Sequence, residues 1–477
     1  MENDSRGTRP LPERSAPKSR WPWFVAAGCL LLLCLAILFP PNKETNSTGL
    51  TASTNSPNPV PTAGEMSAQD RLASKLANLQ AIAQVAPTAS EIVSNKVAQF
   101  ARSRRELARA MAEHFKATLP PEFERFYDAA EAGRFDEMQA IYKSLRKQRE
   151  DGADKSWYGP QWRTIVETVG VAEAAHDWPA QKLLDYGNAV LGSLRPGMVY
   201  LGGTDPGCFI PTLLNETSEG ERHMVLTQNA LADGTYLEYL NFLYGDRLKT
   251  ITQEESTRAF QEYLTDAQKR LQHDQQFPNE PKQIRPGEDI RVVDNRVQVS
   301  GQVAVMTINE KLFQTLMRNN PDVSFGMEQS FPFTSTYAKA TALGPIMELR
   351  VQDEGNAMTA ARAARAVDYW RTTAQQLLSD PETPDGSDPR KAYSKMAVEQ
   401  AAFLLDRKYT GEAEQAFKIA TEIWPSSPEA VSRYVDLLTK QNRFEEAIPV
   451  IENGLKLNPD NQQFRDLLQE VQKRAKR

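Results

Sequence analysis

Hydrophobic and polar positions divide the chain into segments with different periods. Apolar residues recur every three or four positions between residues 67 and 196, and again after residue 351, which is typical of amphipathic helices. Between these regions, short apolar runs are separated by turns that contain Gly, Pro and Asn. We therefore expect an α-helical region at 67–196, a small α/β domain at 197–351 and a helical module at 352–477.

The strand pattern of the middle region is specific enough to place individual elements. Strands are predicted at 198–203, 223–228, 290–293, 297–299, 303–306, 324–327 and 346–351. About 20 residues separate the first two strands, which is enough for a parallel crossover with a helix from Phe209 to Asn215.

The longest apolar run extends from Trp21 to Phe39 and contains no charged residue. A helix of this length would span about 28 Å, close to the ~30 Å hydrocarbon core of a bilayer. Lys and Arg are in excess before the run, and only Lys43 follows it closely. This asymmetry predicts a cytoplasmic tail at 1–20, a transmembrane helix at 21–40 and an extracytoplasmic C-terminal bulk, which we expect in a bacterial inner membrane and periplasm.

Two other interpretations of this apolar run stay open. A cleaved signal peptide would end in a small-x-small site, but this run ends in Phe-Pro-Pro. A lipid-modified Cys29 would close the run, but Cys29 lies in its middle. Residues 41–66 are rich in Ser, Thr, Asn and Pro without periodicity, which predicts a flexible linker.

Composition narrows the class of protein. The 477 residues are 40% apolar and 25% charged, which fits two or three globular domains and excludes a disordered chain. The 56 basic and 62 acidic residues give a net charge of −6, which argues against nucleic acid as the main partner. Two of the three cysteines lie in the apolar run, which excludes a disulfide framework.

Two C-terminal segments align at an offset of 34 residues. The matching pairs are Leu404 and Leu438, Ala413 and Ala447, Phe417 and Ile451, Ala420 and Gly454, and Pro425 and Pro459, with Ala401 a further small position. This spacing and residue set resemble the tetratricopeptide repeat. The resemblance implies helix pairs at 394–427 and 428–461 that pack through these residues, followed by a cap helix at 462–477.

The same resemblance implies a protein-binding concave surface on the first helix of each repeat. The positions that correspond to this surface are Lys395, Val398 and Ala402, then Glu429, Ser432 and Asp436. Their mixed charge differs from the Lys, Arg and Asn cluster of the carboxylate-binding members of the family. A protein partner is expected here, and packing of the repeats on the α/β domain is the alternative. Residues 122–147 resemble a degenerate repeat.

A second resemblance covers residues 197–470. The order Gly-Gly-Thr-Asp-Pro-Gly at 202–207, Thr-Gln-Asn-Ala-Leu-Ala-Asp at 227–233, then repeats, is similar to the soluble extracytoplasmic tail of large multi-spanning bacterial membrane proteins of the glycosyltransferase type. It implies an enzyme or accessory subunit of cell-envelope glycan or lipid-linked sugar metabolism, the alternative to a membrane-anchored scaffold. The catalytic residues of such a family are expected in its multi-spanning part.

The ends of the first two strands carry the candidate ligand-binding residues. The loop at 202–208 has the glycine spacing of a phosphate loop but lacks the following Lys and Ser or Thr, so nucleotide binding is rejected. Adjacent parallel strands would instead gather Thr204, Asp205, Gln228 and Asn229 at one sheet edge. The alternative is that Asp205 only caps a turn.

Other chemistry has little support in the sequence. The four histidines are scattered, and no metal-binding or nucleophile motif occurs. Cys208 is expected to be a small buried residue. Arg102, Arg104, Arg105 and Arg109 form a basic cluster, interpreted as a solvated helix face or a surface for an anionic partner. We assign no catalytic residue, metal or cofactor, and favour a binding protein over an enzyme.

Overall fold

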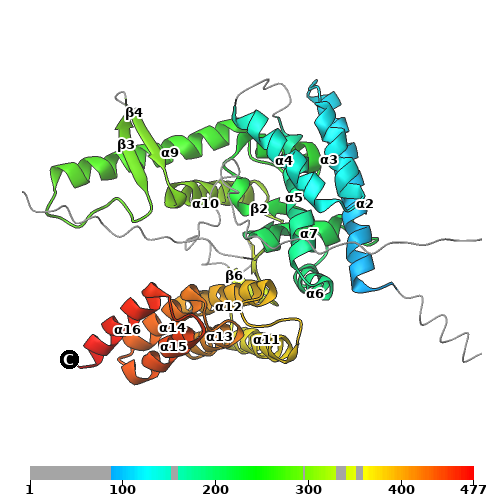
Figure 1. Cartoon of the computed structure of the whole chain (residues 1–477). Helices are drawn as coiled ribbons and strands as arrows, with labels where there is room; N and C mark the ends of the chain where they lie inside the picture. The colour runs from blue at the N-terminus through cyan, green and yellow to red at the C-terminus, as the bar shows by residue number, and fades with distance from the viewer. Residues whose placement is uncertain (1–86, 152–158, 294–295, 329–339, 351–357, 477) are drawn as a thin grey trace, which may run out of the picture.

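The computed structural model describes residues 87–151, 159–293, 296–328, 340–350 and 358–476. The described residues are mostly helical, with one five-stranded sheet and one two-stranded sheet (Figure 1). The predicted transmembrane helix and linker lie outside these residues. Among the helices that are described, none has the length and apolar character needed to cross a bilayer.

The N-terminal helices form a layer beside the sheet. They are α2 (Ala89–His114), α3 (Pro121–Glu131), α4 (Phe135–Glu150), α5 (Trp162–Asp177) and α6 (Ala180–Leu191). Helix α2 begins with a capping box, in which Thr88 and Glu91 satisfy each other's backbone amides. Helices α2 to α5 share a separate hydrophobic core around Phe123, Phe126 and Tyr127.

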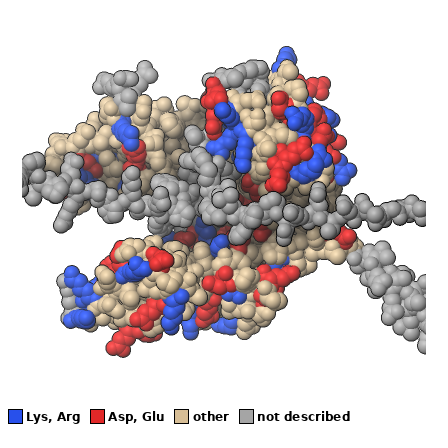
Figure 2. Space-filling view, viewed as in Figure 1, with Lys and Arg blue, Asp and Glu red and all other residues tan. Residues whose placement is uncertain are grey.

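The basic cluster on α2 is neutralised within this layer. Arg104 is buried, with its Nε 2.8 Å from Glu167 on α5. Arg105 and Arg109 bind Asp128 and Glu124 on α3 at 2.6 and 2.7 Å. Blue and red atoms are accordingly interspersed over this region in Figure 2. The solvated helix face expected from sequence holds for the exposed Arg102 and Arg109 but is wrong for the buried Arg104, and the neighbouring helices supply acidic partners to the cluster.

The five-stranded sheet has the order β2-β1-β5-β7-β6. Its strands are β1 (Val199–Gly202), β2 (Met224–Thr227), β5 (Phe325–Met327), β6 (Ala340–Leu343) and β7 (Ile346–Leu349). Strand β1 pairs in parallel with both β2 and β5, as expected for the first two strands, whereas β7 runs antiparallel to β5 and β6. The carboxyl ends of β1, β2 and β5 therefore meet at one edge.

The connections of the middle region differ from the sequence prediction at two points. They are α7 (Asp205–Glu216), the 3₁₀ turn η1 (Gln228–Ala230), α8 (Gly234–Tyr244), α9 (Gln253–Gln276), hairpin strands β3 (Asp289–Val293) and β4 (Arg296–Ser300), and α10 (Gln302–Asn319). Helix α7 begins at Asp205 rather than Phe209. The run 303–306, predicted as a strand, lies in α10, because a four-residue apolar run does not distinguish strand from helix.

The C-terminal module is a stack of helices below the sheet in Figure 1. Its helices are α11 (Ala360–Ser379), α12 (Asp388–Asp406), α13 (Thr410–Ile423), α14 (Pro428–Lys440), α15 (Phe444–Leu457) and α16 (Gln462–Ala475). The residues expected to pack the repeats are buried, apart from the two helix-ending prolines: the buried set is Ala401, Leu404, Ala413, Phe417, Ala420, Leu438, Ala447, Ile451 and Gly454. A Cβ on Gly454 would lie 2.8 Å from the Phe464 ring, so the cap helix requires this glycine.

Three inter-helix turns have the same backbone geometry. Lys408 and Asn442 adopt φ values of 68° and 60° in the two repeats, and Gly133 adopts 67° between α3 and α4. In each turn the next residue donates its amide five residues back, as from Arg134 to Ala129 at 2.9 Å. The end of α2 also has this geometry, with Lys116 at φ 54° and the Ala117 amide donating to Ala112 at 2.8 Å, so the motif is not specific to the repeats and the degenerate repeat at 122–147 stays a prediction.

Candidate functional site

The loop between β1 and α7 wraps around the carboxylate of Glu328, which directly follows β5. The amides of Gly203 and Thr204 each donate to Oε2 at 3.0 Å. The hydroxyls of Thr204 and Tyr186 donate to Oε1 at 2.6 and 2.9 Å. Glu328 is 2% exposed. The protein's own carboxylate thus occupies the place where a phosphate loop would hold its anion.

The Glu328 carboxylate explains why this loop needs a glycine at 207 and a threonine at 204. A Cβ on Gly207 would lie 1.9 Å from Glu328 Oε2, so only glycine fits there. Thr204 is the N-cap of α7 and accepts the Gly207 amide at 3.0 Å. Sequence reasoning considered Asp205 for the capping role, which was wrong because the helix begins one residue after Thr204.

Asp205 lies in the first turn of α7 and is solvent-exposed. Desolvation by the surrounding protein raises the pKa of Asp205, Lys395 on α12 opposes that shift, and Glu328 adds to it. The carboxyl group therefore faces the first helix of the repeat module.

Gln228 and Asn229 follow β2 but have different environments. Asn229 Nδ2 donates to the carbonyl of Gly203 at 3.0 Å, which ties the ends of β1 and β2 together. Gln228 is 0% exposed, and neither of its side-chain amide atoms has a hydrogen-bond partner. The structure therefore brings Thr204 and Asn229 to one loop, and within the described residues no hydrogen bond joins Asp205 to Gln228.

Sequence reasoning missed Glu328 and Arg163. Arg163 on α5 donates from Nη2 to the hydroxyl of Thr227 at 2.9 Å and lies 4.6 Å over the ring of Tyr236. Its Nε is buried without a hydrogen-bond partner. Glu328 could have been considered as a candidate from its position at a strand end, whereas Arg163 lies in the first turn of α5 and nothing in its local sequence points to the end of β2.

Cys208 is buried in α7, as expected. Burial is the main cause that raises the pKa of its thiol, which is unsuited to nucleophilic chemistry. Across the part of the chain that the structure describes, His, Cys, Asp and Glu side chains form no group that could hold a metal ion.

A separate pocket of about 430 Å³ lies at the opposite edge of the sheet, lined by residues that include Arg195, Met198, Ser324 and Arg350. Glu348 is buried beside it and pairs with Arg195 and with Arg350 Nε, the latter at 2.9 Å. The carboxylate lies between two guanidinium groups and stabilises this end of the strands. The predicted ligand residues are not part of this pocket.

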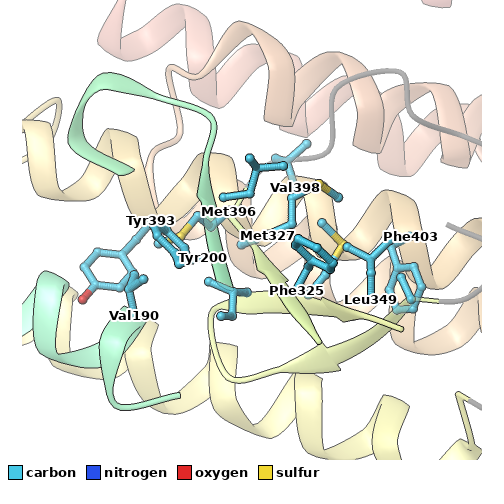
Figure 3. Packing of buried hydrophobic residues seen from close by; sticks show 14 of the residues in the cluster. Val190, Tyr200, Phe325, Met327, Leu349, Tyr393, Met396, Val398 and Phe403 are labelled. Carbon is cyan, nitrogen blue, oxygen red and sulfur yellow. The ribbon is translucent and has the colours of Figure 1, made fainter. Parts of the chain in front are cut away.

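The first repeat packs directly on the sheet. Figure 3 shows Met396, Val398 and Phe403 of α12 against residues of β5 and β7. Polar contacts fix the same interface, because the amide of Gln400 donates to the carbonyls of Gly344 and Ile346 at 2.8 and 3.0 Å. The packing that sequence analysis kept as the alternative is therefore present for the first repeat.

The second repeat leaves its corresponding face accessible. Val398 is 1% exposed, whereas its equivalent Ser432 on α14 is half-buried and Asp436 is exposed. Glu429 begins this face and is also half-buried. The clearest change is therefore at the Val398 position, which is buried on α12 and partly exposed on α14, whereas Lys395 and Ala402 on α12 are half-buried.

The tetratricopeptide repeat family model matches residues 404–471. This segment runs from the end of α12 through α13, α14 and α15 into α16. The C-terminal module therefore contains tetratricopeptide repeats. No curated protein and no solved structure matches the chain.

Proposed function

We propose that this protein is a scaffold that binds a protein partner on the second repeat and the cap helix, while the first repeat holds the module on the α/β domain. The observation that carries the proposal is the change in exposure between equivalent positions. Val398 is covered by the chain itself, and Ser432 and Asp436 are accessible. A partner segment that continues past α12 would meet α14 next.

The chemistry of this face suits a partner of mixed charge. Arg433 lies 3.8 Å from Glu429, and Lys440 lies 2.7 Å from Asp436, so each acid has a basic neighbour one turn along. Such exposed pairs contribute only about 0–1 kcal/mol each. Breaking these ion pairs to form new ones with a partner would therefore cost little free energy.

Site-specific photocrosslinking in the native host tests this surface. A photoreactive residue at Ser432 or Asp436 should give an adduct with one defined protein. The matched control is Glu452, an exposed position on α15, the second helix of the same repeat. Adducts at all three positions, or at none, would contradict a binding face on α14.

Anchoring of the scaffold to a membrane through residues 21–39 is a further part of the proposal. Its support is the uncharged apolar run and the excess of Lys and Arg before it. The bulk of the chain would then lie outside the cytoplasm. Alkaline phosphatase fused after Arg477 should be active, and a cytoplasmic reporter at the same position should be inactive; the reverse result would contradict this orientation.

A further inference from the structure

Four buried polar atoms without hydrogen-bond partners lie around the end of β2. They are Gln228 Oε1, Gln228 Nε2, Asn229 Oδ1 and Arg163 Nε, which lie together in the described part of the chain. Buried polar groups in proteins are almost always hydrogen-bonded, to protein, water or ligand. Their concentration at one strand end indicates a missing polar component.

Two of these side chains are held in place by their remaining atoms. Asn229 is anchored through Nδ2 on the Gly203 carbonyl. Arg163 is anchored through Nη2 on Thr227 and through its position over Tyr236. Tyr236 is itself fixed, because its hydroxyl accepts the Thr227 amide at 2.6 Å. Asn229 Oδ1 and Arg163 Nε are therefore set in position before any ligand arrives.

The charges around the strand end favour an anion. Arg163 forms no ion pair with an acidic residue that the structure describes, and the only hydrogen bond of its side chain there is to a neutral hydroxyl. The nearby carboxylates have other partners: Glu328 accepts four hydrogen bonds, and Asp205 faces Lys395. Among the described residues, the guanidinium therefore has no close counter-ion.

The unpartnered atoms define the ligand's chemistry. Arg163 Nε and Gln228 Nε2 are donors, and Gln228 Oε1 and Asn229 Oδ1 are acceptors. We propose that the carboxyl end of β2 binds a small molecule with an oxyanion for Arg163 and hydroxyl groups for the two amide side chains. A hydroxycarboxylate and a phosphate monoester share this chemistry. Ligands of α/β sheets bind at this edge of parallel strands.

Thermal unfolding of the full-length chain tests the proposal. D-gluconate and glycerol 3-phosphate are titrated as the two probes, with glycerol and sodium chloride as controls for hydroxyl groups and ionic strength. One of the probes should raise the melting temperature in a concentration-dependent way. The probe that does so distinguishes the carboxylate source from the phosphate source. Small molecules extracted from the purified protein are identified in parallel by mass spectrometry.

Two substitutions link the shift to the strand end. Gln228→Met removes both amide atoms at similar length, and Arg163→Gln removes the charge. Each should weaken the apparent affinity about tenfold or more, while the exposed controls Gln376→Met and Arg258→Gln bind like wild type. Gln228→Met without probe should melt no lower than wild type, because it removes an unpartnered buried amide.

Three outcomes would overturn the proposal. The first is no shift with either probe together with no extracted oxyanion, which would leave ordinary buried water as the missing component. The second is wild-type affinity in both strand-end variants. The third is loss of binding in only one of them, because then the guanidinium and the amide do not serve one ligand. None of these outcomes bears on partner binding at α14.

Discussion

Replacing Glu328 by Gln tests whether the carboxylate organises the β1–α7 loop. The glutamine carbonyl can still accept the amides of Gly203 and Thr204. Its NH₂ group then meets the hydroxyls of Thr204 and Tyr186, which donate to Oε1 in the wild type at 2.6 and 2.9 Å. Tyr186 in particular has only the thioether of Met396, at 3.9 Å, as another acceptor.

The expected cost follows from these four bonds. A hydrogen bond to a charged group contributes about 1.5–3 kcal/mol and one between neutral groups about 0.5–1.5 kcal/mol, so four bonds that lose their charge assistance cost about 4 kcal/mol. Lower desolvation of the neutral amide offsets part of this, which leaves about 2–4 kcal/mol. For a domain of this size the melting temperature should fall by roughly 5–15 °C.

Differential scanning calorimetry of the full-length chain measures the effect, with the exposed Glu221→Gln as the matched control. Unfolding of several regions need not be two-state, so the comparison uses the transition that shifts rather than one global free energy. Hydrogen exchange should show weaker protection at Gly203 and Thr204, whose amides then donate to a neutral carbonyl. A melting profile within about 1 °C of wild type would refute the reasoning, because four buried donors cannot lose a carboxylate at so small a cost.

Other regions give independent predictions. Gly207→Ala should lower the melting temperature as strongly as loss of the buried carboxylate, since the added Cβ would lie 1.9 Å from it; normal melting would contradict this close approach. Ala413→Leu and Ala447→Leu should each cost about 1–3 kcal/mol by overpacking the repeats, and unchanged unfolding of both would show that the repeat register is wrong. The pKa of Asp274 is lowered, first by hydrogen bonds from backbone amides after α9. The folded pKa lies below the unfolded one, so this contribution is present above the ordinary value of 3.8 and is lost as the pH falls through the lowered pKa; Asp274→Asn should flatten the pH dependence of stability there, and an identical acid profile would contradict the assignment. Protease added outside spheroplasts should digest the chain beyond about residue 42, and full protection of the C-terminal part would contradict the proposed orientation.

Local sequence patterns were sufficient for many of the regular elements, although strand β6 was not predicted. The strands at β1 and β2, the helices α8 and α9, and the repeat helices all follow from period and turn residues, because each is determined within about 30 residues. The run at 303–306 was misassigned because its four apolar residues fit either period. Only the helix that contains it, from Gln302 to Asn319, resolves the ambiguity.

Only the part of the candidate site that lies at the ends of the adjacent strands β1 and β2 could be predicted from the sequence. The parallel pairing of β1 and β2 brought Thr204 and Asn229 to the same edge, as expected from the crossover length. Glu328 lies more than a hundred residues further along, and its role depends on β5 pairing on the other side of β1. Periodicity carries no information on such long-range pairing, so the strand-end position could make Glu328 a candidate but could not identify it as the partner of the glycine loop.

The burial of Gln228 could not be predicted from the sequence either. A glutamine after a strand is usually exposed, and nothing in the surrounding residues indicates that its amide is enclosed without partners. Arg163 reaches the end of β2 from α5, through a contact that spans 64 residues. The residues that suggest a ligand are therefore those whose environment is built by tertiary structure.

The repeat module and the glycine loop are connected through α12. Tyr186 donates to Glu328, and its ring meets the ring of Tyr393 at 5.4 Å in a T-shaped arrangement. Met396, one turn further along α12, contacts the same tyrosine hydroxyl. In a free repeat, α12 would line the first part of the binding groove. Here it supports Tyr186, the donor to the buried Glu328 carboxylate, so the first repeat serves as a structural part of the α/β domain. The accessible second repeat is thereby held at a fixed position relative to the end of the sheet, which is the geometry that a scaffold requires.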